Sequence, residues 1–150
     1  MKLVIQRVKN ASVTADGVLS GSIKLGLLVL IGVVDGDTEA QAKYLAGKTA
    51  RLRIFTDNED KLNLSVSDVG GEVLVVSNFT LAGDCKKGNR PSFDKAGKQP
   101  VSEQLYLKYV EYLREEGLKV ETGVFGAHME IDMHALGPIT IVMDTKEMGH

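Results

Sequence analysis

The spacing of apolar and polar residues along the chain predicts a fold rich in short strands. Nine segments either alternate between the two residue classes or form short β-branched runs, and they are residues 2–8, 12–14, 18–23, 25–34, 62–66, 73–76, 118–122, 129–133 and 139–143. Asp16-Gly17 separates two of them and is typical of a hairpin turn. So many strands and hairpins predict an α+β fold with a curved mixed or antiparallel, barrel-like sheet system.

Two further segments carry the signals of helices. Thr38 followed by Gln41 forms a capping box, so the first helix is expected to begin there and to end near Arg53. The second helix is expected to begin at Ser102, as its N-cap, and to end before Gly117, where a C-terminal glycine is typical. In the expected α+β fold both helices pack on the sheet.

Length and composition bound the class of protein. With 150 residues and no linker, repeat or low-complexity tract, the chain is expected to form a single domain over residues 1–150. No segment reaches the roughly 18 apolar residues that cross a bilayer, so no membrane partner is expected. The single Cys85 excludes an internal disulfide framework and predicts a cytoplasmic location.

The stretch from Val73 to Phe93 has the layout of a binding or catalytic site. Its apolar start predicts a strand buried on both faces, and the polar motif Ser77–Leu81 follows. A Gly/Pro-rich loop comes next. The segment from Asp84 to Lys98 holds five basic residues against two acidic ones, although the whole chain has a net charge of −2. A rigid strand followed by a basic loop predicts a site for a polyanion on one face of the protein.

Within this loop, the residues from Gly88 to Pro91 can bind a phosphate through backbone N–H groups and the Arg90 guanidinium. A plain surface turn is the alternative, because Gly-Asn and Arg-Pro pairs both favour turns. The neighbouring Lys86 and Lys87 favour phosphate binding.

Side-chain nucleophiles and metal ligands are poorly supported. No base stands near Ser77 or Thr80, so we expect these hydroxyls to position a substrate or a water rather than to attack. Cys85 has no Cys-His signature beside it, and a thiol enzyme is not expected. From His128 to His134, two histidines and two acids alternate with apolar residues, which suits a metal site or an amphipathic strand. Four such side chains span about 20 Å at roughly 3.3 Å per residue, too far to bind one ion, so no metal is expected.

Several of these segments together resemble one family. Ser77-Asn78-Phe79-Thr80-Leu81 is similar to the Ser-Gln-Phe-Thr-Leu motif of the D-aminoacyl-tRNA deacylases, with Asn in place of Gln. The loop from Gly88 to Phe93 matches the basic loop of that family, and the segment from Gly137 to Thr140 is similar to its Gly-Pro-Val-Thr motif. The other similar segments are Gln6-Arg7-Val8, Leu52-Arg53-Ile54-Phe55 and Glu121–Ala127. Six motifs in the same order cover essentially the whole chain, which makes the resemblance specific.

This resemblance implies a cytoplasmic homodimer that hydrolyses the ester between a D-amino acid, or glycine, and the 3′ end of tRNA, with no cofactor. The implied catalytic residues are Ser77, Asn78 and Thr80, which position the substrate while the terminal 2′-hydroxyl of the tRNA and a water react. Phe79 and Phe125 are expected to line the pocket for the terminal adenosine and the aminoacyl group.

The resemblance also assigns a role to the Gly-Pro motif. Gly137 and Pro138 are expected to be joined by a cis peptide bond and to enter the pocket of the partner subunit. There their backbone carbonyls would hold the substrate amino group and leave no room for an L side chain. Arg7 is expected to brace that loop. The expected tRNA-binding residues are Lys86, Lys87, Asn89 and Arg90.

Two other functions stay open at this point. One is a tRNA-binding module of the same fold with weak or lost turnover, because Asn78 and Ala135 differ from the residues usual in the family. The other is a metallohydrolase that uses His128 and His134, and it is the less favoured of the two.

Overall fold

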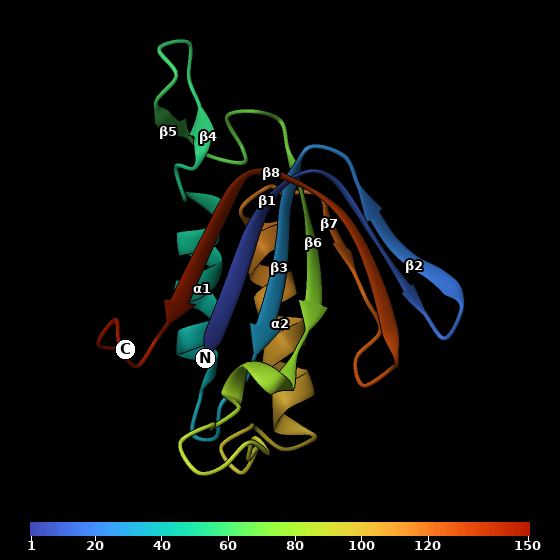
Figure 1. The fold of residues 1–150 in the computed structure, drawn as a ribbon. Coiled ribbons are helices and arrows are strands. Elements are labelled where there is room, and N and C mark those ends of the chain that lie inside the picture. The colour runs from blue at the N-terminus through green and yellow to red at the C-terminus, as the bar shows by residue number, and fades with distance from the viewer.

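The structure is a computed structural model that describes all residues, 1–150, as a sheet system covered by two α-helices (Figure 1). The strands are β1 (Lys2–Ala15), β2 (Val18–Ile23), β3 (Gly26–Gly32), β4 (Phe55–Thr56), β5 (Leu62–Leu64), β6 (Glu72–Ser77), β7 (Val120–Thr122) and β8 (Met129–Asp144). The helices are α1 (Glu39–Ala50) and α2 (Val101–Glu115), and η1 (Phe79–Ala82) is a short 3-10 helix after β6.

Six strands form one mixed sheet in which β1 is the shared partner. β1 pairs antiparallel with β2, β3 and β8, whereas β3 pairs with β6, and β6 with β7, in parallel. Ser20 Oγ of β2 donates a hydrogen bond of 2.9 Å to the Thr122 carbonyl of β7, so the two ends of the curled sheet meet. The predicted α+β class with a curved, barrel-like mixed sheet is confirmed.

Two pairs of predicted strands are in fact single long strands. Residues 2–8 and 12–14 both lie within β1, and residues 129–133 and 139–143 both lie within β8. The apparent breaks are irregularities in the β1–β8 pairing, where the register shifts on either side of Val8. A bulge of this kind bends a strand without ending it, which is why the sequence pattern predicted two strands each time.

The helix ends agree with the sequence in part. Thr38 and Gln41 form the predicted capping box, with Gln41 Oε1 accepting the Thr38 N–H at 2.8 Å. α1 ends at Ala50, three residues earlier than expected. The prediction that Ser102 caps α2 is wrong, because Pro100 is the N-cap and Ser102 lies inside the helix, buried. Proline suits a helix start, where its missing N–H would have no intrahelical partner.

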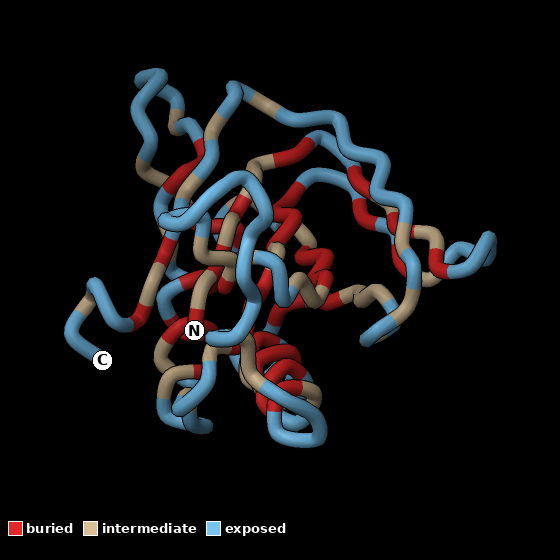
Figure 2. Tube along the Cα trace, turned by 60° about the horizontal axis from the view of Figure 1, so that its bottom comes forward, coloured by how far each residue is buried: buried red, intermediate tan, exposed pale blue.

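Two hydrophobic cores lie on opposite faces of the sheet. The larger one fills the space between the sheet and both helices and includes the fully buried Leu3, Val29 and Leu45. The smaller one lies inside the curve of the sheet and includes Val13 and Leu74. Figure 2 shows the buried residues gathered in the middle of the molecule, with exposed residues along the outer loops. No helix is long and apolar enough to cross a membrane.

A buried hydrogen bond joins the two helices inside the larger core. The hydroxyl oxygens of Thr49 on α1 and Tyr109 on α2 are 2.9 Å apart, and both residues are 0% exposed. Burial raises the pKa of the Tyr109 hydroxyl above its ordinary value, so the phenol stays protonated at neutral pH. Each hydroxyl is therefore the partner that keeps the other from being buried unsatisfied.

Tyr109→Phe is expected to lower the free energy of unfolding by about 1–3 kcal/mol, because it leaves Thr49 Oγ1 buried without a partner. Adding Thr49→Val should recover part of that loss, since apolar groups of similar shape then replace the pair. Urea unfolding of the wild type, both single variants and the double variant measures the coupling. A double variant whose loss equals the sum of the single losses would contradict the dependence.

Candidate functional site

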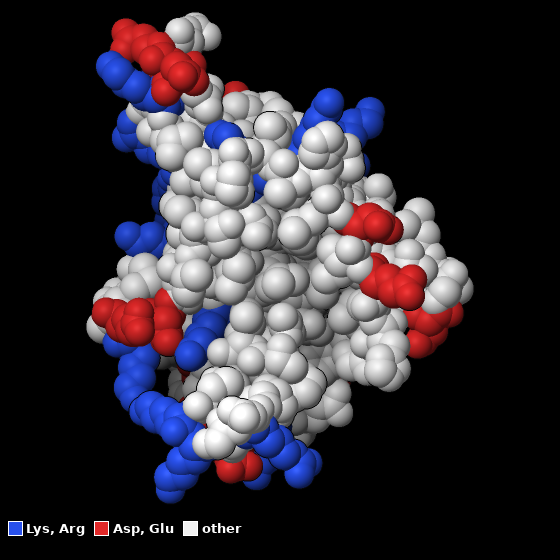
Figure 3. Space-filling view, viewed as in Figure 1, with Lys and Arg blue, Asp and Glu red and all other residues white.

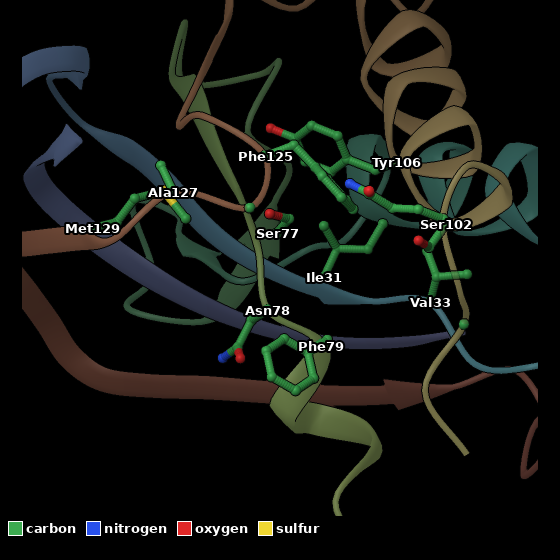
Figure 4. Close-up of a pocket in the computed structure, with 13 residues that line it drawn as sticks. Ile31, Val33, Ser77, Asn78, Phe79, Ser102, Tyr106, Phe125, Ala127 and Met129 are labelled. Carbon is green, nitrogen blue, oxygen red and sulfur yellow. The ribbon is translucent and has the colours of Figure 1, made fainter. Parts of the chain in front are cut away.

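A cavity of about 320 Å³ opens beside the carboxyl ends of the parallel strands β3 and β6 (Figure 4). Its walls come from those strand ends, from the start of η1, from the first turns of α2 and from the loop between β7 and β8. The carboxyl ends of neighbouring parallel strands are a common place for ligands in mixed α and β proteins. Of the residues that the sequence assigns to a site, Ser77, Asn78, Phe79 and Phe125 line this cavity.

The polar groups of the predicted motif reach the cavity because β6 ends there. Ser77 is the last residue of β6 and pairs with Ile31 of β3. Asn78 then caps η1, because its Oδ1 accepts both the Thr80 N–H, at 3.2 Å, and the Thr80 hydroxyl. The Asn78 amide nitrogen has no partner within the chain and is free to donate to a ligand. Thr80 itself is exposed and does not line the cavity.

Aromatic rings form one wall and the mouth of the cavity. The rings of Phe125 and Tyr106 lie 5.6 Å apart between centroids, tilted by 48°. The Tyr106 hydroxyl donates to the Val75 carbonyl at 3.3 Å, and burial raises its pKa to about 12, so it stays protonated at neutral pH. Phe79 is 57% exposed and meets Phe93 edge-on, with centroids 5.3 Å apart. Flat apolar walls with few polar groups suit an aromatic ligand.

Three polar side chains of the cavity were missed by the sequence analysis. Gln99, Ser102 and Tyr106 come from the end of the long loop and the first turns of α2. Tyr106 and Ser102 occupy positions that the helix turns toward the sheet, and both are buried. The sequence held no signal for Gln99, because its place in the site depends on where α2 packs.

The predicted basic loop is an exposed strap closed at its base by a pair of hydrogen bonds between Asp84 and Ser92. Asp84 also accepts a hydrogen bond from the Lys95 ammonium at 2.8 Å, a contact that lowers the pKa of the Asp84 carboxyl and pairs the charge of Lys95. The residues expected to bind tRNA are all exposed, and none of the three cations among them forms an ion pair. They are Lys86, Lys87, Asn89 and Arg90. Figure 3 shows blue side chains gathered at the foot of the molecule, where this strap lies.

A bulge in β8 holds the predicted Gly-Pro pair. Gln6 pairs with Thr140 and Val8 with Ala135, so the single residue Arg7 faces residues 136–139. The peptide bond between Gly137 and Pro138 is cis. Proline fits here because the interrupted ladder does not need its missing N–H.

Arg7 fills the gap in the ladder and ties it to the neighbouring hairpin. Its Nε donates to the Leu136 carbonyl at 3.1 Å, which is the brace expected from the sequence. Its Nη1 donates to the Ile54 carbonyl at 3.0 Å and to Thr56 Oγ1 at 3.1 Å. One guanidinium therefore holds the bulge and the start of the β4–β5 hairpin together.

The bulge and the cavity lie at opposite ends of the sheet within one chain. Ile31 pairs with both Leu3 and Ser77, so the cavity is level with the start of β1. Arg7 is four residues further along, which is roughly 13 Å at about 3.3 Å per residue. In Figure 1 the middle of β8 is accordingly at the top and the coil after β6 at the bottom. Gly137 and Pro138 do not line the cavity of their own chain.

The histidines considered as metal ligands lie just before β8 and in its first half. His128 precedes β8, His134 lies within it, and both are exposed. No group of three or more His, Cys, Asp or Glu side chains is placed to hold a metal ion.

Comparison with known proteins gives consistent matches over the whole chain. The family model described as D-Tyr-tRNA(Tyr) deacylase matches residues 4–144. The D-aminoacyl-tRNA deacylase of Koribacter versatilis (strain Ellin345) is 53% identical over 147 residues, which cover 98% of this chain and 99% of that protein. The D-aminoacyl-tRNA deacylase of Bacillus velezensis is 52% identical over 147 residues, which cover 98% of this chain and 100% of that protein.

Two solved structures share the fold. A protein described as "c-Myc DNA Unwinding Element Binding Protein" superposes with a TM-score of 0.89 at 37% identity, over 96% of this chain and 98% of that one. A second, described as "Structural Analysis of a probable eukaryotic D-amino acid tRNA deacylase", superposes with a TM-score of 0.81 over 95% of this chain and 97% of that one. At 18% identity the second likeness concerns the fold alone.

Arg7→Ala is expected to loosen the bulge, because residues 136–139 and the β4–β5 hairpin lose their shared donor. Amide hydrogen exchange should speed up in both segments, with a loss of about 1–3 kcal/mol in their protection. Arg53→Ala is the matched control, since the Arg53 guanidinium bonds only to Asn63 inside the hairpin. It should affect the hairpin alone. Unchanged exchange at residues 136–139 in Arg7→Ala would rule out the brace.

Proposed function

The chain belongs to the D-Tyr-tRNA(Tyr) deacylase family, and from this premise we propose how its site selects and cleaves the substrate. As a D-aminoacyl-tRNA deacylase it is a hydrolase. The proposed substrates are D-aminoacyl-tRNA and glycyl-tRNA formed in error, and L-aminoacyl-tRNA is left intact. The proposed place of action is the cytoplasm, which suits a free, exposed Cys85.

The observation that carries the proposal is a polar strand end inside an apolar cavity, next to a strap of unpaired cations. The terminal adenosine of the tRNA enters the cavity, where its base can stack on the Phe125 ring and pack against aliphatic side chains. The scissile ester lies near Ser77 and Asn78, whose hydroxyl and amide nitrogen have no partner within the chain. Lys86, Lys87 and Arg90 meet phosphates of the acceptor end.

The proposed reaction needs no side-chain nucleophile. The Thr80 hydroxyl already donates to Asn78 Oδ1, and an exposed hydroxyl with no neighbouring base is a poor nucleophile. A water held at the strand end attacks the ester carbonyl instead, assisted by the vicinal 2′-hydroxyl of the tRNA. The ester oxygen leaves as the ribose 3′-hydroxyl, and the D-amino acid departs as a free acid.

Selection between D and L residues is proposed to come from the partner subunit. The bulge at Gly137 lies far from the cavity of its own chain, but a two-fold related copy can present it to this cavity. Its backbone carbonyls then accept hydrogen bonds from the substrate amino group and block the direction in which an L side chain would point. Glycine, with no side chain, passes the same filter.

The face of the sheet away from the helices supports such a homodimer. Val4 of β1 pairs with Val142 of β8 on one side and Leu30 of β3 on the other, so the three form an apolar row on the side away from the helices. Val142 is 69% exposed in the single chain. Figure 3 shows this face free of charged side chains over its middle. An uncharged apolar face fits a two-fold interface, in which each chain gives and receives the same contacts.

Release of amino acid from D-Tyr-tRNA and L-Tyr-tRNA, with and without chelator, tests the proposed function. Of the two enantiomers, only D-Tyr-tRNA is expected to release its amino acid, and chelator should not change the rate. Gly-tRNA is expected to be cleaved as well. Equal release from both enantiomers would contradict the exclusion mechanism, and loss of activity with chelator would indicate a metallohydrolase. Binding of tRNA without any release would indicate a binding module.

Replacing Lys86 and Lys87 together with Ala is expected to weaken tRNA binding without changing the ratio of D to L activity. The slope of log K against log salt should become shallower by roughly 1.4–1.8, because two phosphate contacts are lost. Ala at both Lys43 and Lys48 on α1 removes the same charge from another face and should leave the slope unchanged. A changed D to L ratio with unchanged binding would overturn the assignment of the strap.

Val142→Glu is expected to split the dimer and abolish turnover, because the partner bulge is then missing from each cavity. Each carboxylate buried without a partner costs about 1–3 kcal/mol or more, and the two-fold axis doubles the cost. Val18→Glu is the matched control, since Val18 is 70% exposed and lies in the hairpin that begins β2. Sedimentation together with D-Tyr-tRNA hydrolysis measures both effects. A fully active monomer would refute the partner's role.

A further inference from the structure

The α2 end of the cavity holds two polar side chains that the proposed reaction does not use. Gln99 immediately precedes the helix cap Pro100 and is exposed, and Ser102 lies in the first turn of α2 and is 7% exposed. Neither side chain has a hydrogen-bond partner within the chain. No fully buried side-chain nitrogen or oxygen in the protein lacks a partner, so the unpartnered Ser102 hydroxyl reaches the open space of the cavity.

These groups stand apart from the strand end where the ester is placed. Figure 4 shows Ser102 and Val33 beside α2 at one end of the cavity, and Ala127 and Met129 at the other. The other polar groups nearby are already engaged, since the Tyr106 hydroxyl donates to a backbone carbonyl and Asn78 Oδ1 caps η1. The free donors and acceptors at the α2 end are therefore those of Gln99 and Ser102.

The walls between the two ends fit a flat heterocycle. Ile31, Val33 and Phe125 are apolar, and a ring lying against them would present its polar edge to the start of α2. A carboxamide carries one acceptor and two donors on a planar group. The edge of adenine offers the matching pair, a 6-amino donor beside the N7 acceptor, and glutamine is a common bidentate partner for it.

We propose that Gln99 reads the 3′-terminal base as adenine, with its Oε1 accepting from the 6-amino group and its Nε2 donating to N7. Ser102 supplies a second contact, from its hydroxyl to a ring nitrogen of the same base. The inference rests on the proposed function, in which the terminal adenosine occupies this cavity. Stacking alone would hold any base, whereas a glutamine at the edge makes the site selective.

The alternative is that Gln99 is merely a solvated side chain at the rim of the cavity. Two stable analogues separate the possibilities. In one, D-tyrosine is joined through an amide to 3′-amino-3′-deoxyadenosine. In the other, unsubstituted purine, which lacks the 6-amino group, replaces adenine. Each is used to inhibit the release of D-tyrosine from D-Tyr-tRNA, so that Ki reports binding to the intact site.

The wild type is expected to bind the adenine analogue roughly five- to tenfold more tightly than the purine analogue, the value of about one good hydrogen bond in a bidentate pair. In Gln99→Ala that preference should fall to about one, because the group that senses the 6-amino donor is gone. Gln104→Ala is the matched control: Gln104 is an exposed glutamine of α2 that does not line the cavity. It should keep the wild-type preference.

Ser102→Ala tests the second contact. It should weaken both analogues by the same factor, since the ring nitrogens are common to both. Unchanged Ki values for both analogues would show that Ser102 does not contact the base.

The outcome also separates this inference from the proposed function. If the wild type binds both analogues equally, or if Gln99→Ala keeps the preference for adenine, the reading of the base by Gln99 is wrong while deacylation stands. If neither analogue inhibits and D-Tyr-tRNA is not hydrolysed, the proposed function itself fails.

Discussion

The site depends on β1 being hydrogen-bonded along both of its edges. The first half of β1 pairs with β3 and β8, and its second half pairs with β2 and again with β8. A slip of one residue in any of these pairings would turn buried side chains such as Leu3 and Ile5 to the face away from the helices. The core therefore fixes the register, and the register fixes where β6 ends at Ser77 and where β8 bulges opposite Arg7. The geometry of the site is thus set by packing far from any substrate.

The same register keeps the two halves of the proposed site apart in one chain. The proposed mechanism therefore includes a dimer, in which a two-fold partner brings its Gly137 bulge to the cavity. Selection by exclusion also suits the task. Attraction in an apolar pocket separates similar side chains by only about 1–3 kcal/mol per methylene, whereas a rigid wall discriminates by clash. Gly137 permits such a wall: its φ is +130°, and an added Cβ would lie 2.6 Å from the Ile139 nitrogen. No other residue fits there without moving the loop.

Much of the fold and part of the site could be predicted from the sequence, and the errors have physical causes. The capping box at Thr38 was correct because its hydrogen bonds are local. The N-cap at Ser102 was wrong because a preceding proline starts the helix, which leaves the serine buried. The prediction split each of the long strands β1 and β8 in two, because local patterns do not show that a strand continues through an irregular pairing. Ser77 and Asn78 could be placed beside the cavity because they lie at the end of a strand that the sequence predicts, whereas Gln99 and Tyr106 reach the cavity only through the packing of α2.

The unreactive side chains of the site explain why so much of it serves to hold the substrate. With the Thr80 hydroxyl bound to Asn78, the reacting groups of the proposed mechanism are a water and the vicinal 2′-hydroxyl of the tRNA. Their contribution depends on orientation, because reacting atoms held in line are worth far more than the same atoms free in solution. A ribose is oriented by what is fixed on either side of it. In the proposed complex those fixed points are the base at the start of α2 and the amino group at the partner's carbonyls. In that arrangement side chains at the start of α2 would fix one end and backbone carbonyls the other, so that binding energy would align the ester between them.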